Sequence, residues 1–195
     1  MLGAMYGSTT GDSGRLVPRL RRTFPGAMAM VDDAARVGEA GGIVTTWLGR
    51  SSPPPDPLWH AAQAHASEPG ASGADEARAR RRAGDRGRFT RNFIVQGTAA
   101  EWALAWLADL RLRLAALPPV PQTDAAPQSG AAFERSPHLA FFLHDEIIVH
   151  TPAALAEQVA AEVRASAASA GRLLFGDFPI DFPLDLRIAE SADKV

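Results

Sequence analysis

The residues best suited to chemistry form one polar triplet, His144-Asp145-Glu146, called here the hairpin tip. Short apolar runs flank it at residues 139–143 and 147–149. Their length and their aromatic and β-branched content predict two strands buried on both faces, joined by a tight hairpin. Adjacent carboxylates at such a turn repel each other and lose hydration, and a hard cation such as Mg²⁺ would relieve both costs. The alternative is an ordinary solvated hairpin tip, where acidic residues are common.

A second polar group recurs with helical spacing. Residues 89–117 carry apolar side chains at three- and four-residue steps, which predicts a long amphipathic helix. Arg88, Asn92 and Gln96 follow one another at four-residue steps near its start, so they share one side of the helix and form what is called here the polar ridge. Planar polar groups of this kind suit base edges or backbone oxygens. The alternative is three unrelated surface residues.

Other helices and strands must position these two groups. Hydrophobic periodicity predicts helices at residues 16–23, 27–40, 59–66 and 152–172, and strands at residues 43–48 and 180–188. Residues 74–91 are rich in arginine, and we expect one break in them at residues 84–87, which contain two glycines. A charge run of this kind is usually a solvated face.

The C-terminal part of the chain has its own start and edge signals. Thr151-Pro152 predicts the beginning of a helix, with Thr151 as N-cap and Pro152 at the first helical position. Residues 180–188 alternate strictly between apolar and polar, which predicts a strand with one solvated face. Pro183 cannot donate a backbone hydrogen bond and therefore favours an edge position for that strand.

These elements predict an α+β fold. The expected sheet is short and antiparallel, built from the hairpin at residues 138–150 and the strand at residues 180–188. We expect helices 89–117 and 152–172 to pack on one face of that sheet. A chain of 195 residues, 46% hydrophobic and 22% charged, is long enough for one sizeable domain or two small ones.

Composition narrows the possible classes of protein. Arginine supplies nearly all of the positive charge, and Lys194 is the only lysine. The absence of cysteine excludes disulfides and thiolate metal sites. The chain has no apolar run long enough to span a membrane and no signal-peptide pattern at its start, so we expect a cytoplasmic protein without a membrane partner.

Several motifs, read in order, resemble the C-terminal part of family A DNA polymerases, the DNA polymerase I type. Residues 143–149 resemble the third polymerase motif of that family. The pattern Arg88-x-x-x-Asn92-x-x-x-Gln96-Gly97-Thr98-Ala99-Ala100 is similar to the helix that grips the primer-template. The segment from Pro25-Gly26 to Gly49-Arg50 resembles the link from fingers to palm, and Met5-Tyr6-Gly7 resembles the end of the nucleotide-binding O helix.

The resemblance implies a role for each matched residue. Asp145 would be a catalytic carboxylate that binds Mg²⁺, Glu146 would assist it as catalyst and ligand, and His144 would lie near the primer terminus. The polar ridge would contact template and primer in the minor groove, and Tyr6 would close the pocket for the incoming deoxynucleoside triphosphate. Phosphoryl transfer depends mainly on positioned cations and positive charge, which suits this set of residues.

The resemblance covers late fingers and part of a palm. It implies late fingers and the return to the palm at residues 1–50, a Pro/Arg-rich connector at 51–87 and the palm part at 88–195. The family's first catalytic aspartate motif and the Arg and Lys of its O helix have no counterpart here. We therefore expect a truncated DNA-directed DNA polymerase, inactive by itself, whose upstream half is a missing partner if it exists as a separate chain.

Two other functions remain open. One is a DNA-binding remnant, in which the arginine-rich segment and the polar ridge hold duplex DNA without catalysis. The other is an unrelated metal-dependent hydrolase that uses Asp145, Glu146 and the three histidines His138, His144 and His150. A spacing of six residues along a hairpin fits no common metal-ligand motif, which argues against the hydrolase.

Overall fold

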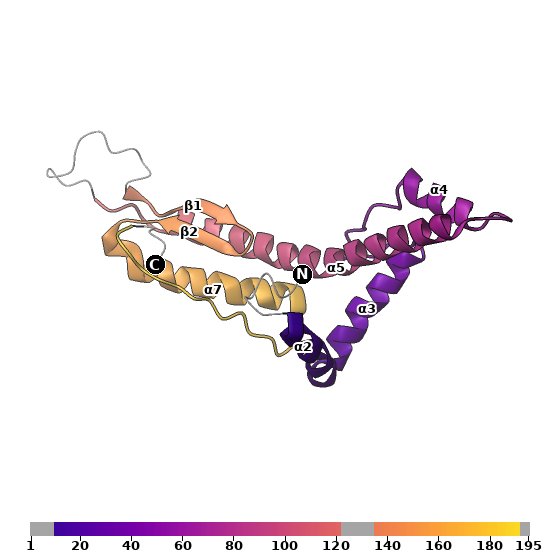
Figure 1. Cartoon of the computed structure of the whole chain (residues 1–195). Coiled ribbons are helices and arrows are strands. Elements are labelled where there is room, and N and C mark those ends of the chain that lie inside the picture. The colour runs from indigo at the N-terminus through magenta and orange to yellow at the C-terminus, as the bar shows by residue number, and fades with distance from the viewer. Residues whose placement is uncertain (1–9, 122–134, 192–195) are drawn as a thin grey trace. The chain divides into compact units, whose positions relative to one another are not determined.

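The structure, a computed structural model, describes residues 10–121 and 135–191, with side chains from Leu16 onward. The chain divides into two compact units, Met1–Thr98 and Ala99–Val195. The described residues are mostly helical and contain one two-stranded antiparallel sheet, which agrees with the α+β class in its coarse form (Figure 1). The predicted division at residues 50 and 87 rests on the resemblance alone and stays a prediction.

Three helices and the first part of a fourth make up the first unit. They are α2 (Thr10–Thr23), α3 (Pro25–Glu39), α4 (Pro57–Ala66) and α5 (Gly73–Ala116). The bounds of α3 and α4 agree with the predicted helices within two residues, whereas α2 begins six residues earlier than predicted and α5 begins 16 residues before the predicted start at residue 89. Local signals explain the boundaries. Asp56 caps α4 by accepting a hydrogen bond from the Trp59 backbone N–H at 2.7 Å. Gly41, with φ 79°, ends α3 in a Schellman motif.

The helix α5 starts at a capping box and continues without a break. The Ser72 hydroxyl accepts from the Asp75 backbone N–H at 3.2 Å, and the Asp75 carboxylate accepts from the Ser72 N–H at 3.1 Å. The hydrogen bonds from Ser72 hold the pKa of Asp75 below its ordinary value. The predicted break at residues 84–87 is therefore wrong, although a helical glycine costs about 1 kcal/mol relative to alanine.

Packing against α3 explains why glycine is tolerated inside α5. A Cβ atom at Gly87 would lie 2.7 Å from the Glu39 side chain and 3.0 Å from the Ala35 carbonyl oxygen. Opposite, a Cβ at Gly38 would lie 2.1 Å from the Thr90 hydroxyl. Fully buried Thr90 donates to the Ala34 carbonyl across this crossing, at 2.7 Å. The two helices approach so closely because each contributes a glycine at the contact.

The predicted strand at residues 43–48 is wrong, because the backbone of this segment forms hydrogen bonds with residues 50–52 instead of with another strand. Only Thr45 and Ser51 form an isolated bridge. The Ser52 N–H donates to the Val44 carbonyl at 2.8 Å, and Gly49, with φ 86°, turns the chain between them. The result is a closed loop. The Arg50 guanidinium donates to the Gly97 carbonyl at 3.2 Å, which fixes this loop on α5.

The core of the second unit lies between the end of α5 and α7 (Ala156–Phe175). Its buried residues are Trp106, Leu110, Leu114, Val159, Val163, Ala167 and Ala170. The indole N–H of Trp106 donates to the Ser166 hydroxyl at 3.1 Å, which satisfies the one polar atom of that ring. On the rim, Arg113 pairs with Asp109 and Glu162; its hydrogen bonds to these carboxylates raise its pKa.

Thr151 is not a helix N-cap. A short 3₁₀ helix η1 (Ala153–Leu155) precedes α7, and Leu155 occupies the residue before the α-helix without a side-chain cap. The Thr151 hydroxyl donates to the Pro152 carbonyl at 3.3 Å. Pro152 is extended, so it lies outside the helix that it was expected to begin.

The predicted hairpin is present as β1 (His138–Leu143) and β2 (Glu146–His150). It is covered on one face only, which corrects the expectation of strands buried on both faces. Leu139, Ile147 and Val149 pack on the core of α5 and α7, as expected for helices on one face of the sheet. The other face leaves apolar side chains exposed, among them Phe141, Leu143 and Ile148.

Residues 180–188 do not form a strand, so the predicted third strand is wrong. Their alternation is nevertheless real: Phe182, Leu184 and Leu186 face inward while their neighbours are exposed. Phe182 stacks on Trp102 with ring centroids 4.5 Å apart, and a Cβ at Gly171 would lie 3.0 Å from the Phe182 ring. Side-chain packing on α5 and α7 therefore holds this segment, with no backbone pairing to the sheet. Among the described residues, no helix combines the length and the apolar character needed to cross a membrane.

Replacing Gly38 with Ala should destabilise the first unit. The added Cβ would meet Thr90 and the Arg86 backbone carbonyl, and overpacking of this kind costs about 1–3 kcal/mol or more. The control is Gly26→Ala on the same helix, which has open space around its Cβ and should stabilise by roughly 0.5–1 kcal/mol. Thermal unfolding followed by circular dichroism compares them. Equal melting temperatures for both variants would contradict the close approach of α3 and α5.

Candidate nucleic-acid interface

The hairpin tip is built by a two-residue loop. Leu143 pairs with Glu146, so His144 and Asp145 alone connect the strands. His144 has φ 56°, a left-handed conformation, and it is the one described non-glycine residue with positive φ. Such a loop position normally holds glycine, and a side chain there costs on the order of 1 kcal/mol.

All three residues of the hairpin tip are exposed to solvent. Asp145 and Glu146 offer carboxylate oxygens, the ligands that Mg²⁺ prefers, so the donor chemistry fits that ion. Their number does not make a complete site, because no group of three or more possible metal ligands exists in the part of the chain that the structure describes. Further ligands would have to come from phosphates or from another segment.

His138 and His150 lie at the end of the hairpin opposite to His144. His138 pairs with His150, and their rings meet edge to face with centroids 5.1 Å apart. His138 Nδ1 also lies 3.1 Å from the Ser136 carbonyl oxygen. These two rings therefore contact each other and lie apart from His144. The hydrolase alternative consequently has no set of metal ligands among the described residues.

The polar ridge is exposed along one side of α5, as its spacing predicts. The side-chain amides of Asn92 and Gln96 have no hydrogen-bond partner among the described residues, so these amide groups are available to a ligand. Arg88 forms an exposed ion pair with Asp85 one turn earlier. Sequence reasoning missed Asp85, although a carboxylate three residues before an arginine on a helix is a recognisable pairing signal.

The neighbouring Arg86 has a structural role. Arg86 is 9% exposed, and its guanidinium donates to the Gly42 and Pro53 carbonyls at 3.0 and 2.6 Å. Burial lowers the pKa of Arg86, and Asp56 opposes this effect. The same guanidinium lies 5.4 Å from the Phe89 ring centroid. Beside it is a hollow of about 440 Å³, lined by Pro53, Pro54, Asp56, Trp59, Arg82, Asp85, Arg86 and Phe89.

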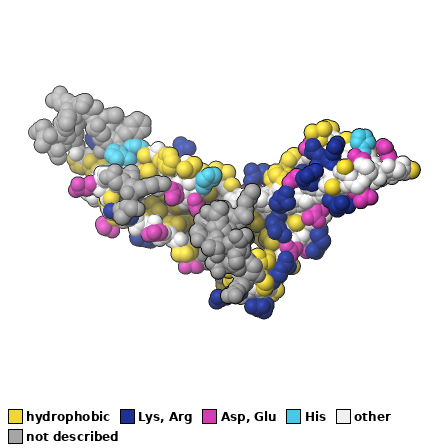
Figure 2. Space-filling model, in the orientation of Figure 1, with side chains coloured by type: hydrophobic (Ala, Val, Ile, Leu, Met, Phe, Trp, Pro, Cys, Tyr) yellow, Lys and Arg dark blue, Asp and Glu magenta, His cyan; other side chains and the backbone are white. Residues whose placement is uncertain are grey.

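Charge is divided unequally between the two units. Residues 1–98 contain 13 arginines and nine acidic residues, a formal charge of +4, whereas residues 99–195 contain seven basic and 13 acidic residues, a charge of −6. Figure 2 shows arginine side chains gathered over the first unit. The polar ridge belongs to the positive unit and the hairpin tip to the negative one.

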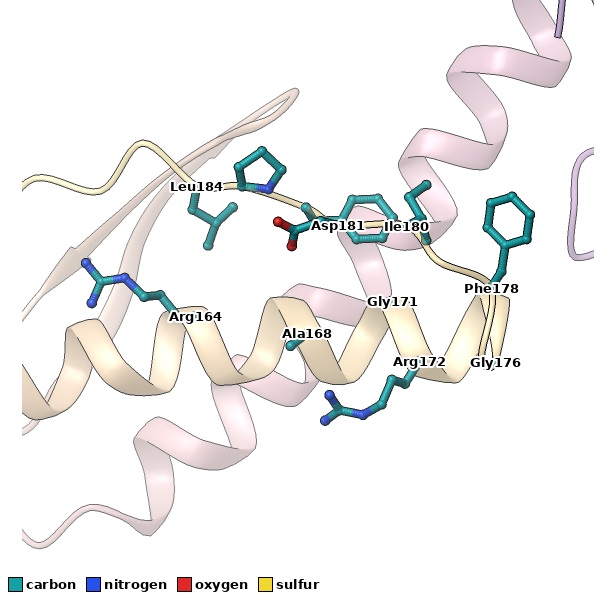
Figure 3. A pocket seen from close by; sticks show the side chains of 11 residues that line it. Arg164, Ala168, Gly171, Arg172, Gly176, Phe178, Ile180, Asp181 and Leu184 are labelled. Carbon is teal, nitrogen blue, oxygen red and sulfur yellow. The ribbon is translucent and has the colours of Figure 1, made fainter. Parts of the chain in front are cut away.

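A second hollow lies within the second unit, between α7 and the segment that follows it. It has a volume of about 420 Å³. Figure 3 shows Arg164, Ala168 and Arg172 along α7, with Asp181 and Leu184 on the returning chain. None of the predicted site residues lines it. Tyr6, the predicted nucleotide-binding residue, lies outside the described residues.

Replacing His144 with Gly should stabilise the hairpin, because glycine adopts positive φ without the steric cost of a side chain. The expected gain is up to about 1 kcal/mol in the free energy of unfolding. His138→Gly is the control and should destabilise, because glycine weakens a strand and the contact with His150 is lost. Denaturant titration measures both. Destabilisation by His144→Gly would contradict the strained loop.

Comparison of the chain with protein-family models, with curated proteins and with solved structures gave no match. The functional interpretation therefore rests on the residues themselves: an exposed polar ridge on a helix of a positive unit, and two exposed carboxylates at a strained hairpin tip.

Proposed function

We propose that this chain is part of a DNA polymerase of the family A type and acts in template-directed nucleotidyl transfer during DNA replication or repair. The observation that carries the proposal is the hairpin, because residues 143–149 resemble the third polymerase motif of that family and fold as two paired strands with the polar triplet at their junction. Asp145 and Glu146 stand exposed where an ion and phosphates can reach them. The polar ridge supports it as a second motif that is exposed along its whole length.

The hairpin tip would hold Mg²⁺ together with substrate phosphates. The bound ion supplies charge neutralisation and orientation of the phosphates. The tip's own contribution is positional: the two-residue loop presents Asp145 at the end of a paired hairpin, with His144 beside it in a left-handed backbone conformation. In the proposed role, the His144 imidazole would lie near the primer terminus.

The polar ridge would contact the duplex in its minor groove. Every base pair presents acceptors there, and amide and guanidinium donors can bind them without selecting sequence. This suits an enzyme that must accept any primer-template. The positive charge of the first unit favours the same ligand, because duplex affinity depends strongly on phosphate neutralisation.

Other parts of the enzyme would complete the site. Both edges of the hairpin are unpaired among the described residues, and its uncovered face carries Phe141, Leu143 and Ile148. An upstream palm segment would cover such a face and supply the family's first catalytic aspartate motif. Tyr6 would contact the incoming deoxynucleoside triphosphate, and we place the protein in the cytoplasm.

A second candidate function is duplex binding without catalysis. Two observations favour it: the hairpin tip has too few ligands for a complete metal site, and the positive charge lies in the unit that carries the polar ridge. A photocrosslinker distinguishes the two functions. His144→p-benzoylphenylalanine should crosslink to the 3′ end of the primer if the chain is a polymerase part, and a binding remnant would crosslink at no fixed position.

Duplex DNA should bind weakly, without sequence preference and with strong dependence on salt. The double variant Arg88→Ala/Gln96→Ala should lose about tenfold or more in affinity, because a good two-donor contact is worth roughly 1–3 kcal/mol. Fluorescence anisotropy with a labelled 14-base-pair duplex measures this. Unchanged binding by the double variant would remove the polar ridge from the site.

Asp85 should restrain DNA binding. Its carboxylate occupies Arg88 and repels phosphates, so Asp85→Asn should raise duplex affinity roughly three- to tenfold at low salt. Asp33→Asn is the matched control, since Asp33 forms a similar exposed pair with Arg36 on α3. A gain of the same size in both variants would indicate a general effect of net charge.

The chain by itself should not extend a primer with Mg²⁺ and four deoxynucleotides. A two-metal site needs bridging carboxylates from two segments, and Asp145 and Glu146 come from one hairpin. Each loss of about 1.4 kcal/mol in transition-state stabilisation slows the reaction tenfold. A primer-extension gel decides: extension that disappears in Asp145→Ala would show that the chain is a complete enzyme.

A further inference from the structure

We infer that Arg78 and Arg81 extend the polar ridge and bind backbone phosphates of the same duplex, so that α5 lies along about eight base pairs. The inference rests on the proposed function of the ridge, and it adds two residues and a length. Neither residue belongs to the matched polymerase motif, and both stand in a segment that was expected to break away from the ridge.

Continuity of α5 places these residues on one side of the helix. Because the helix is unbroken from Gly73 to Ala116, positions turn by about 100° per residue throughout. Arg78, Arg81, Arg88, Asn92 and Gln96 then fall within an arc of roughly 80°. With a rise of about 1.5 Å per residue, the 18 steps from Arg78 to Gln96 span roughly 27 Å.

Seven arginines lie between residues 78 and 91. Among the described residues, five of them have ion-pair or hydrogen-bond partners, and Arg78 and Arg81 are the other two. Arg80 pairs with Glu76, Arg82 lies 3.7 Å from Asp56, and Arg91 pairs with Asp32. Arg86 is buried against carbonyls and Arg88 pairs with Asp85, as described above.

Arg78 and Arg81 are exposed, and neither has an ion-pair or hydrogen-bond partner among the described residues. Arg78 acts on Asp75 through space, where it contributes to the lowered pKa of that carboxyl. Two guanidinium groups on one exposed face, close to residues proposed to hold DNA, fit phosphate oxygens by charge and by hydrogen-bond geometry.

Length and register favour a duplex as the ligand. A B-form duplex rises about 3.4 Å per base pair, so roughly 27 Å corresponds to about eight base pairs. Asp85 also lies within the arc and would repel phosphates, but its pairing with Arg88 neutralises much of that charge. The ridge therefore presents two phosphate-binding arginines at one end and donors for the minor groove at the other.

The test compares two DNA hairpins with the complete chain. One has a 14-base-pair stem, and the other a four-base-pair stem that is too short to reach from Gln96 to Arg78. The variant Arg78→Gln/Arg81→Gln removes both guanidinium groups and keeps good helix formers. The matched control is Arg36→Gln/Arg80→Gln, which removes two exposed arginines that lie away from the arc. Fluorescence anisotropy over a range of salt concentrations gives affinity and salt dependence.

On the long stem, the variant should lose up to roughly sixtyfold in affinity at 0.1 M salt, and its log–log salt slope should decrease by about 1.8, as expected for two lost phosphate contacts. On the short stem it should bind almost as the unmodified chain does, and the control variant should lose much less on the long stem. This combination supports the inference.

Other outcomes overturn it in distinguishable ways. Unchanged long-stem binding, while Arg88→Ala/Gln96→Ala loses affinity, removes Arg78 and Arg81 but leaves the proposed function intact. Equal losses in the variant and in the control show an effect of net charge. Equal losses on both stems contradict the length of the contact. No binding by the unmodified chain overturns both the inference and the proposed function.

Discussion

The close contact between α3 and α5 is the constraint on which the first unit depends. Gly38 and Gly87 remove side chains from the two facing surfaces, and the buried Thr90 hydroxyl donates across the gap. Asp32 adds an ion pair to Arg91 on the same pair of helices. The contact lies at the C-terminal end of the arginine-rich run, and it supports α5 at Gly87, where a helical glycine would otherwise weaken the helix. The polar ridge lies on a continuous helix and stays exposed because another side of α5 packs against α3.

In the second unit the same helix serves a different core. Trp106, Leu110 and Leu114 pack against α7, and the hairpin covers this core with the inward side chains of β2. A two-stranded sheet is rarely stable without such a partner, so the helices position the hairpin tip. A bulge between Leu139 and Phe141 shifts the register and leaves the distal part of β1 exposed. The strand ends therefore project a polar loop beyond an apolar surface that is open to another segment.

Backbone conformation and charge pairing distinguish the hairpin tip from the surface of α5. His144 has a backbone conformation that favours glycine, whereas the charged residues on the surface of α5 have helical backbone. Surface ion pairs contribute little to stability, usually less than about 1 kcal/mol, so the arginine pairs are better understood as determining which guanidinium groups stay available. Under the proposed function, competition between Asp85 and phosphates for Arg88 would make duplex affinity depend on salt.

Local signals in the sequence determined much of this protein. The hairpin, the helices flanking it and the spacing of Arg88, Asn92 and Gln96 follow from periodicity and turn residues, because these patterns act over a few residues. Only the tertiary structure decided the rest. Gly84 and Gly87 predicted a break in the helix, yet α5 is continuous there and Gly87 packs against α3. Residues 180–188 read as a strand, yet stacking of Phe182 on Trp102 orders them without backbone pairing. The structure also determined which arginines are free, because ion pairs such as Arg91 with Asp32 join residues far apart in the chain. Periodicity records which side of a segment is buried, but the element that buries it lies elsewhere in the sequence.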